Sequence, residues 1–330
     1  MRTPRRFDVC NGDADGLCAV RQWRGEFAAQ AKLITGLKRE IDLLQRVPLD
    51  AEEVLVCDIS LARNREALQR LLERGARVRW FDHHAAGEPP HHAGLEAQLD
   101  FSPGTCSSLL VDRHLQGRQR AWALVGAYGD ELTEVAERLA VDGGLDTKRR
   151  SALRRLGRAI NYNAYGEEPG DPLIHPADLY ALMARHADPF ALLQAEPVIA
   201  AIDRQRDDDL AQAQGLAPTW ASDAARVTVL PDAPWSRRVS GALANALAEA
   251  EPRQAQAVLR IKPGGGYLVS VRAPRASPHG AQALCQAFGG SGRAAAAGID
   301  HLPERELARF IDRLAQASWA ASPREPAAPR

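Results

Sequence analysis

The sequence has no long apolar run and no excess charge of either sign. Nowhere does it approach the roughly 20 apolar residues of a membrane span, and its start, MRTPRRFDVC, lacks the apolar core of a signal peptide. These absences predict a cytoplasmic protein with no membrane partner. Its 42 basic and 42 acidic residues cancel, so no overall positive field would hold a long nucleic acid. Any nucleic-acid partner is expected to be short.

Cysteine is scarce and shows no paired pattern. Five cysteines are scattered over 330 residues without a CxxC motif: Cys10, Cys18, Cys57, Cys106 and Cys285. Most of them lie in apolar segments, so we expect buried, reduced thiols rather than disulfides or a thiolate metal site.

The first part of the chain alternates short apolar runs with helical patterns. Strands are expected over residues 6–10, 32–35, 53–58 and 77–81, and helices over 17–27, 40–47 and 63–74. This βαβ alternation predicts a largely parallel sheet, in which ligands bind at the carboxyl ends of the strands.

The last part of the chain has a different pattern, with strands expected over 226–230, 255–261 and 267–271. The expected fold is α/β: a parallel-sheet domain, then a smaller α/β domain, with the active site in the cleft between them. The predicted division is 1–145 for the first domain, 146–224 for a helical insertion and linker helix, 225–318 for the second domain and 319–330 for a disordered tail.

Acidic and histidine side chains follow three of the expected strands, and one more acid follows an apolar helix. In chain order they are Asp13 and Asp15 in GDADG, Asp58 in CDIS, Asp82, His83 and His84 in FDHH, and Asp130 in GAYGDE. Oxygen and imidazole donors without thiolate suit manganese or magnesium. A calcium-binding EF-hand at GDADG would need a glutamate at position 22, which is Gln22, whereas a plain turn remains an alternative.

The ordered set GDADG, CDIS, FDHH and GAYGDE resembles the four motifs of the DHH phosphoesterase superfamily. This superfamily includes RecJ-type exonucleases, nano-RNA phosphatases, cyclic dinucleotide phosphodiesterases and family II pyrophosphatases. The later GGSGRAAAAGI resembles the glycine-rich motif of the DHH-associated carboxy-terminal domain. The resemblance covers nearly the whole chain except roughly residues 145–225, and it implies metal-dependent phosphoester hydrolysis with two Mn²⁺ ions, or Mg²⁺ in their place.

The resemblance also implies roles for the matched residues. The implied metal ligands are Asp13, Asp15, Asp58, His83 and Asp130, with Asp58 bridging both ions. The implied catalytic residues are Asp58, His83 and His84, the last facing the phosphate. Asp82 and Asn11 would orient the metal ligands without binding the metal themselves. Substrate binding in the second domain is implied for Arg272, Gly289, Gly290, Gly292 and Arg293.

The chain departs from the family pattern at three positions. Val9 stands where many members have a histidine, and Asn11 stands where RecJ-like members have an aspartate. These departures would weaken one metal site, or make it depend on Asn11 or water. Arg293 stands where a histidine usually follows the glycines, and an arginine can still contact phosphate through two hydrogen bonds.

The favoured function is hydrolysis of a phosphodiester in a short oligonucleotide or dinucleotide by water activated between two ions. The alternatives are a noncatalytic nucleotide-binding or regulatory protein with a weakened metal site, and a small-molecule phosphatase or pyrophosphatase. The sequence leaves open the choice between RNA and DNA, the cleavage polarity, the oligomeric state, a homodimer included, and the role of residues 145–225.

Overall fold

The computed structural model describes residues 5–84 and 86–319, and the chain divides into two compact units after Arg206. The predicted segment 146–224 falls on both sides of this division, and its first helix packs on helices of unit 1. The predicted tail, 319–330, lies outside the described residues except for Trp319.

Unit 1 is built on a five-stranded, all-parallel sheet in the order β2-β1-β3-β4-β5, which confirms the expected parallel sheet. Its strands are β1 (Arg6–Cys10), β2 (Lys32–Ile34), β3 (Glu53–Cys57), β4 (Arg77–Asp82) and β5 (Leu95–Leu99). The strand order reverses between β1 and β3, and such a switch point opens a crevice at the carboxyl ends of the strands.

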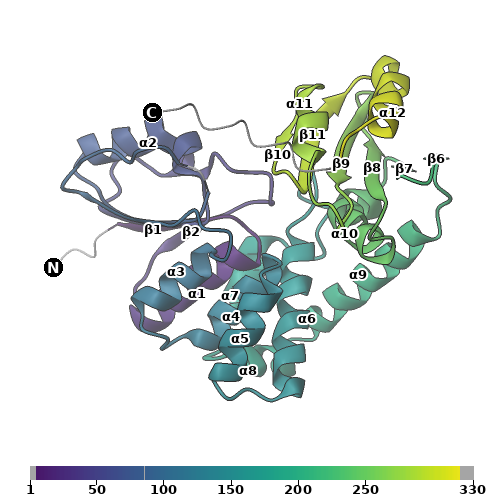
Figure 1. Ribbon diagram of the computed structural model, residues 1–330. Coiled ribbons are helices and arrows are strands. Elements are labelled where there is room, and N and C mark those ends of the chain that lie inside the picture. The colour runs from purple at the N-terminus through teal and green to yellow at the C-terminus, as the bar shows by residue number, and fades with distance from the viewer. Residues whose placement is uncertain (1–4, 85, 320–330) are drawn as a thin grey trace, which may run out of the picture. The chain divides into compact units, whose positions relative to one another are not determined.

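The central strands bury both faces. Along β3, Val54 and Val56 face a core shared with α2, whereas Leu55 and Cys57 face a second core shared with α1, α3 and α4. Figure 1 shows α2 on one side of the sheet and α1 and α3 on the other. A strand covered on both faces reads as a continuous apolar run, which is why EVLVC was recognisable in the sequence.

The helices of unit 1 surround this sheet or pack on one another beside it. They are α1 (Ala14–Glu26), α2 (Leu61–Glu73), α3 (Ser107–His114), α4 (Arg120–Gly129), α5 (Thr133–Asp142), α6 (Thr147–Asn163), α7 (Pro176–Met183) and α8 (Pro189–Ala195), and α9 (Pro197–Gln214) runs across the division between the units.

The helix predicted over 40–47 is wrong in kind, because only a 3₁₀-helix, η1 (Leu43–Arg46), forms there. The side chain of Asn64 accepts a hydrogen bond from the Leu44 amide at 3.1 Å and donates to the Ile41 carbonyl at 2.7 Å. These bonds satisfy backbone groups that an α-helix would have paired internally, and Pro48 then prevents continuation.

Three glycines let α4 lie close to its neighbours. A Cβ atom at Gly157 of α6 would come 2.3 Å from the Val125 carbonyl oxygen, and one at Gly126 would come 2.2 Å from Ser108 Oγ. A Cβ atom at Gly129 would lie 2.3 Å from the Cβ of Ala14. The close approach fixes the end of α4, where Asp130 follows.

Unit 2 contains a six-stranded mixed sheet in the order β10-β11-β9-β8-β7-β6. Its elements are β6 (Trp220–Ala221), β7 (Ala225–Leu230), α10 (Pro234–Ala250), β8 (Ala255–Ile261), β9 (Tyr267–Arg272), α11 (Ala281–Gln286), β10 (Ser291–Gly292), β11 (Ala296–Leu302), η2 (Glu304–Glu306) and α12 (Leu307–Ala315). This is the expected second α/β domain. Within the described part of the chain, no helix combines the length and apolarity needed to cross a membrane.

Candidate metal centre

The predicted acids and histidines of unit 1 meet at one edge of its sheet. Asp13 is the N-cap of α1 just after β1, Asp58 follows β3, and Asp82 ends β4. Asp130 follows α4 as its C-cap residue. These elements surround the switch point between β1 and β3, which explains why residues far apart in the chain lie in one place.

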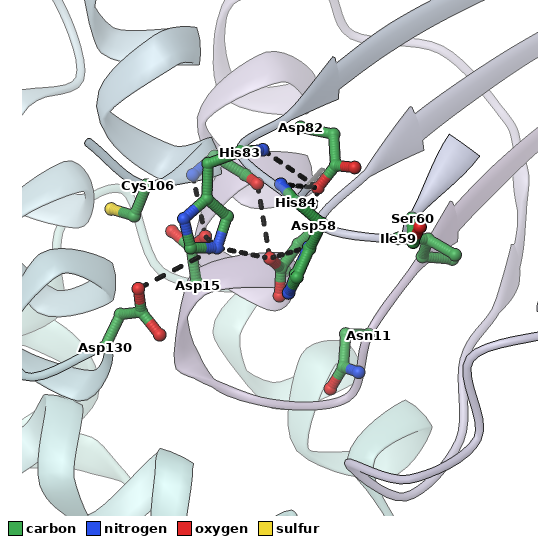
Figure 2. A network of polar contacts seen from close by, with 12 residues as sticks. Asn11, Asp15, Asp58, Ile59, Ser60, Asp82, His83, His84, Cys106 and Asp130 are labelled. Carbon is green, nitrogen blue, oxygen red and sulfur yellow. Dashed lines mark hydrogen bonds and ion pairs between the residues drawn. The ribbon is translucent and has the colours of Figure 1, made fainter. Parts of the chain in front are cut away.

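His83 lies at the centre of the cluster. Its Nε2 atom is 3.4 Å from Asp58 Oδ1, 3.8 Å from Asp130 Oδ2 and 4.0 Å from Asp15 Oδ2. Figure 2 shows the imidazole pointing into the space between the three carboxylates. One nitrogen and three carboxylate oxygens, supplied by four different segments, therefore converge on a small volume.

These donors fit a hard divalent cation. Ligand atoms bound at about 2.1 Å to an octahedral ion lie about 3.0 Å apart when adjacent and about 4.2 Å apart when opposite. The three distances from His83 Nε2 lie between these two values, so the four atoms are close enough together to bind one ion. Atoms of Asp58, His83 and His84 also lie within 4.8 Å of one another. The donor set matches the preference of manganese or magnesium.

Asp58 combines an unfavourable backbone conformation with a carboxylate charge that is disfavoured without a cation. Its φ is +57°, in the left-handed region that few non-glycine residues adopt. Burial, followed by the negative charges of Asp13 and Asp15, raises the pKa of Asp58 well above its ordinary value. Backbone strain combined with a disfavoured carboxylate is typical of a functional position.

Asp130 is in a similar position. Burial and the charge of Asp15 raise its pKa to about 6, although Lys38 and His83 oppose this shift. Its backbone also caps the carboxyl end of α4, where the helix dipole disfavours a negative charge. A bound cation would compensate for both effects.

Asp15 also holds a neighbouring helix in place. Its two carboxylate oxygens accept hydrogen bonds from the backbone amides of Ser107 at 2.7 Å and Ser108 at 2.8 Å. These amides open α3, so Asp15 binds the positive end of that helix. No local sequence pattern indicates this contact between Asp15 and α3, because 92 residues separate Ser107 from Asp15.

Asp82 contacts His84 rather than the His83 ring. Its Oδ1 atom lies 2.7 Å from His84 Nδ1 and accepts hydrogen bonds from the backbone amides of both histidines. Burial lowers the pKa of His84, but the hydrogen bond and charge of Asp82 outweigh burial, so the net shift is upward. His84 is half exposed, and a protonated His84 can donate from Nε2 to an anion.

Sequence reasoning missed Lys38, which lies between the predicted ligands. Its ammonium forms an ion pair with Asp13 Oδ2 and donates to Asn161 Oδ1 at 3.1 Å. Burial raises the pKa of Asp13, but the charge and hydrogen bond of Lys38 outweigh it and hold that pKa at about 2. The contact joins the loop after β2 to α1 and α6, and no local pattern marks it.

Asn11 and Val9 are not donors to the cluster. The Asn11 amide donates to the Lys38 carbonyl at 3.0 Å, and its oxygen accepts from the Asp13 amide at 3.2 Å. Figure 2 shows Asn11 apart from the carboxylates around His83. Val9 is buried in the apolar core beside α2. The Asn11 side chain therefore links the backbones of Asp13 and Lys38 through hydrogen bonds.

The thiols near the cluster are weaker candidates for metal ligands than the carboxylates. All five cysteines are free and buried, as expected. Burial raises the pKa of Cys106, which lies near the cluster in Figure 2, well above its ordinary value. A neutral thiol binds metal weakly, so oxygen and imidazole remain the donors.

The residues predicted to bind substrate in the second domain all belong to unit 2. Arg272 ends β9 and donates from Nε to Asn245 Oδ1 at 2.7 Å, and Arg293 is exposed in the turn between β10 and β11. The amides of Gly289 and Gly290 donate to carbonyls of α11, and a Cβ atom at Gly292 would lie 2.4 Å from Ala297 Cα. The glycines therefore have a structural role in ending α11 and packing β10.

No family model and no curated protein matches the chain. Among solved structures, the exonuclease RecJ bound to manganese is similar over 94% of this chain and 89% of its own, with a TM-score of 0.63 and 19% identity. The chain matches RecJ from Thermus thermophilus in complex with Mn²⁺ at a TM-score of 0.61 and 19% identity, covering 94% of this chain but only 51% of that protein.

Another solved structure matches this chain over nearly all of its own length. The pGpG-specific phosphodiesterase PggH from Vibrio cholerae matches with a TM-score of 0.52 and 15% identity, over 94% of this chain and 98% of its own. At these identities the likeness concerns the fold. It confirms the expected α/β fold, which this chain shares with RecJ and with PggH.

Proposed function

We propose that this chain, which has the DHH fold, is a divalent-metal-dependent phosphoesterase that hydrolyses a phosphodiester in a short oligonucleotide or dinucleotide. The observation that carries the proposal is the convergence of Asp15, Asp58 and Asp130 on His83 Nε2 within 4.0 Å. These four residues would hold Mn²⁺ or Mg²⁺. When bound, such an ion supplies Lewis-acid chemistry that polarises a phosphoryl group and activates water.

The side chains around this centre would divide the remaining work. The three carboxylates and His83 hold the cation and set its position. His84, held by Asp82 through Nδ1, can donate from Nε2 to a phosphate oxygen and neutralise its charge. In unit 2, Arg272 and Arg293 are proposed to contact the substrate, because a guanidinium group can donate two hydrogen bonds to a phosphate.

Three facts support a short nucleic-acid substrate. The chain has no net charge, which disfavours long polyanions. A solved phosphodiesterase with the same fold is specific for pGpG, and RecJ is an exonuclease. The motifs of the chain imply two metal ions. The donors around His83 suffice for one, and Asp13, the remaining predicted ligand, contacts Lys38.

A small phosphoester or polyphosphate is the second candidate substrate. An exopolyphosphatase-related protein from Bacteroides fragilis matches with a TM-score of 0.53 and 12% identity, over 96% of this chain and 92% of its own. Release of mononucleotide from a dinucleotide, compared with release of phosphate from pyrophosphate and polyphosphate under the same Mn²⁺ concentration, separates the two. Faster turnover of the inorganic substrates would overturn the nucleotide proposal.

A further inference from the structure

The second predicted metal position, at Asp13, contains a cation that belongs to the protein. The ammonium of Lys38 contacts Asp13 Oδ2, while Asp13 Oδ1 accepts from the Gly16 amide at 3.1 Å. Both oxygens of this buried carboxylate thus have protein partners. The negative charge of Asp13 is balanced without a metal ion.

Lys38 is held from several sides. Its ammonium donates to Asn161 Oδ1 at 3.1 Å and lies 5.5 Å from the centre of the Tyr165 ring. Its backbone amide donates to the Ala164 carbonyl at 2.9 Å, and its carbonyl accepts from Asn11 at 3.0 Å. An aspartate at position 11 could not donate to that carbonyl, so the amide of Asn11 and the position of Lys38 belong together.

Apart from the carboxylate of Asp58, which interacts with Asp13, the surroundings of Asp13 offer few further donors for an ion. Val9 has only apolar atoms and lies in the core. The Asn11 side chain uses its nitrogen and its oxygen on backbone partners. A divalent ion at Asp13 Oδ2 would also lie within a few ångströms of the Lys38 ammonium, and two cations at such a distance repel strongly in a buried site.

We propose that Lys38 takes the place of the second metal ion, so that the site binds one divalent cation, held by Asp15, Asp58, His83 and Asp130. This inference rests on the proposed metal-dependent function and replaces the expectation of two ions. The Lys38 ammonium supplies a fixed positive charge beside the metal, on the Asp13 side of the cluster.

The test is the number of Mn²⁺ ions bound to the full-length chain. The protein is stripped with a chelator, dialysed to equilibrium against graded Mn²⁺, and its metal content is measured by mass spectrometry. The wild-type chain should bind one ion. Lys38→Met, which keeps the apolar stem and removes the charge, should bind a second ion at least about tenfold more tightly than the wild type does.

Two matched variants control for charge and shape. Lys38→Arg keeps the positive charge and should still bind one ion. Arg39→Met removes a positive charge from the exposed neighbour and should also leave the count at one. Circular dichroism checks folding, and Lys38→Gln replaces Lys38→Met if the latter does not fold. Two tightly bound ions in the wild type, or no gain in a folded, uncharged variant, would overturn the proposal.

This result is separable from the proposed function. Two ions together with hydrolysis of a dinucleotide would reject the role of Lys38 and leave the phosphoesterase proposal standing. One ion without hydrolysis of any phosphoester would support the role of Lys38 and reject the activity.

Discussion

At the scale of the residue, the acids of this site are distinguished by their partners. Asp13 is paired with Lys38, Asp15 binds the start of α3, and Asp82 holds His84. Asp58 and Asp130 are the acids whose pKa is raised. The five aspartates thus have different roles, and these roles depend on the elements that surround each side chain.

Asp82→Asn tests the link between Asp82 and His84. The substitution preserves the size of the side chain but removes its charge, and with it the strongest interaction that orients His84 Nδ1. We expect kcat/KM to fall by about 10- to 100-fold, because residues that orient ligands and catalytic groups typically have effects of this size. A variant with unchanged kcat/KM would show that the contact between the two residues is dispensable.

The pH dependence of metal binding follows from Asp130, whose pKa rises from 3.8 to about 6 in the folded, metal-free protein. Between these values the folded chain binds more protons than the unfolded chain, so the stability of the metal-free protein should fall as pH rises through this window. A metal ion needs the deprotonated carboxylate, so Mn²⁺ affinity should increase as pH rises through about 6.

Calorimetric titration with Mn²⁺ at about pH 5 and about pH 7.5 measures this effect. Asp130→Asn, which cannot titrate, is the matched control and should weaken binding at both values while reducing the dependence on pH. Equal affinity of the wild-type protein at the two pH values would contradict the assignment of Asp130 as a ligand.

At the scale of the element, the strands were easier to predict than their surroundings. EVLVC and RFDVC are strands buried beyond their first residue, and their predicted bounds are right to within one residue, although RFDVC includes the buried Asp8. The edge strand β5, LEAQL, mixes polar and apolar residues because it is only partly buried, and it was not predicted.

Gly157→Ala tests whether close packing of α4 and α6 positions Asp130. The added methyl group would lie 2.3 Å from the Val125 carbonyl oxygen, so the helices must separate. We expect a loss of about 1–3 kcal/mol in the free energy of unfolding, accompanied by weaker Mn²⁺ binding as Asp130 shifts.

Gly170→Ala is the control for this variant, because a Cβ atom there meets no atom within 4 Å. Its thermal stability and Mn²⁺ affinity should match those of the wild type. If Gly157→Ala also left both quantities unchanged, the packing of the two helices would not determine the position of Asp130.

At the scale of the whole molecule, the motifs predicted the fold and most of the cluster, because carboxyl ends of adjacent parallel strands must meet at one edge. They did not predict Lys38, whose partners Asp13 and Asn161 lie 25 and 123 residues away in the chain. They also imply substrate binding by Gly289 and Gly290, and in the structure the backbone amides of both residues end α11. Contacts of this kind depend on tertiary packing and leave no periodic signal.

The most direct test of the central claim is Mn²⁺-dependent release of mononucleotide from a 5′-labelled dinucleotide by the wild-type protein and Asp58→Asn. Asparagine tolerates the positive φ of position 58 better than most residues. The variant should therefore lose the negative charge of the side chain and still fold. We predict release by the wild type, abolished by a chelator, and a reduction of about 100-fold or more in the variant. No release by wild-type protein with Mn²⁺ bound, or undiminished release by Asp58→Asn, would contradict the account.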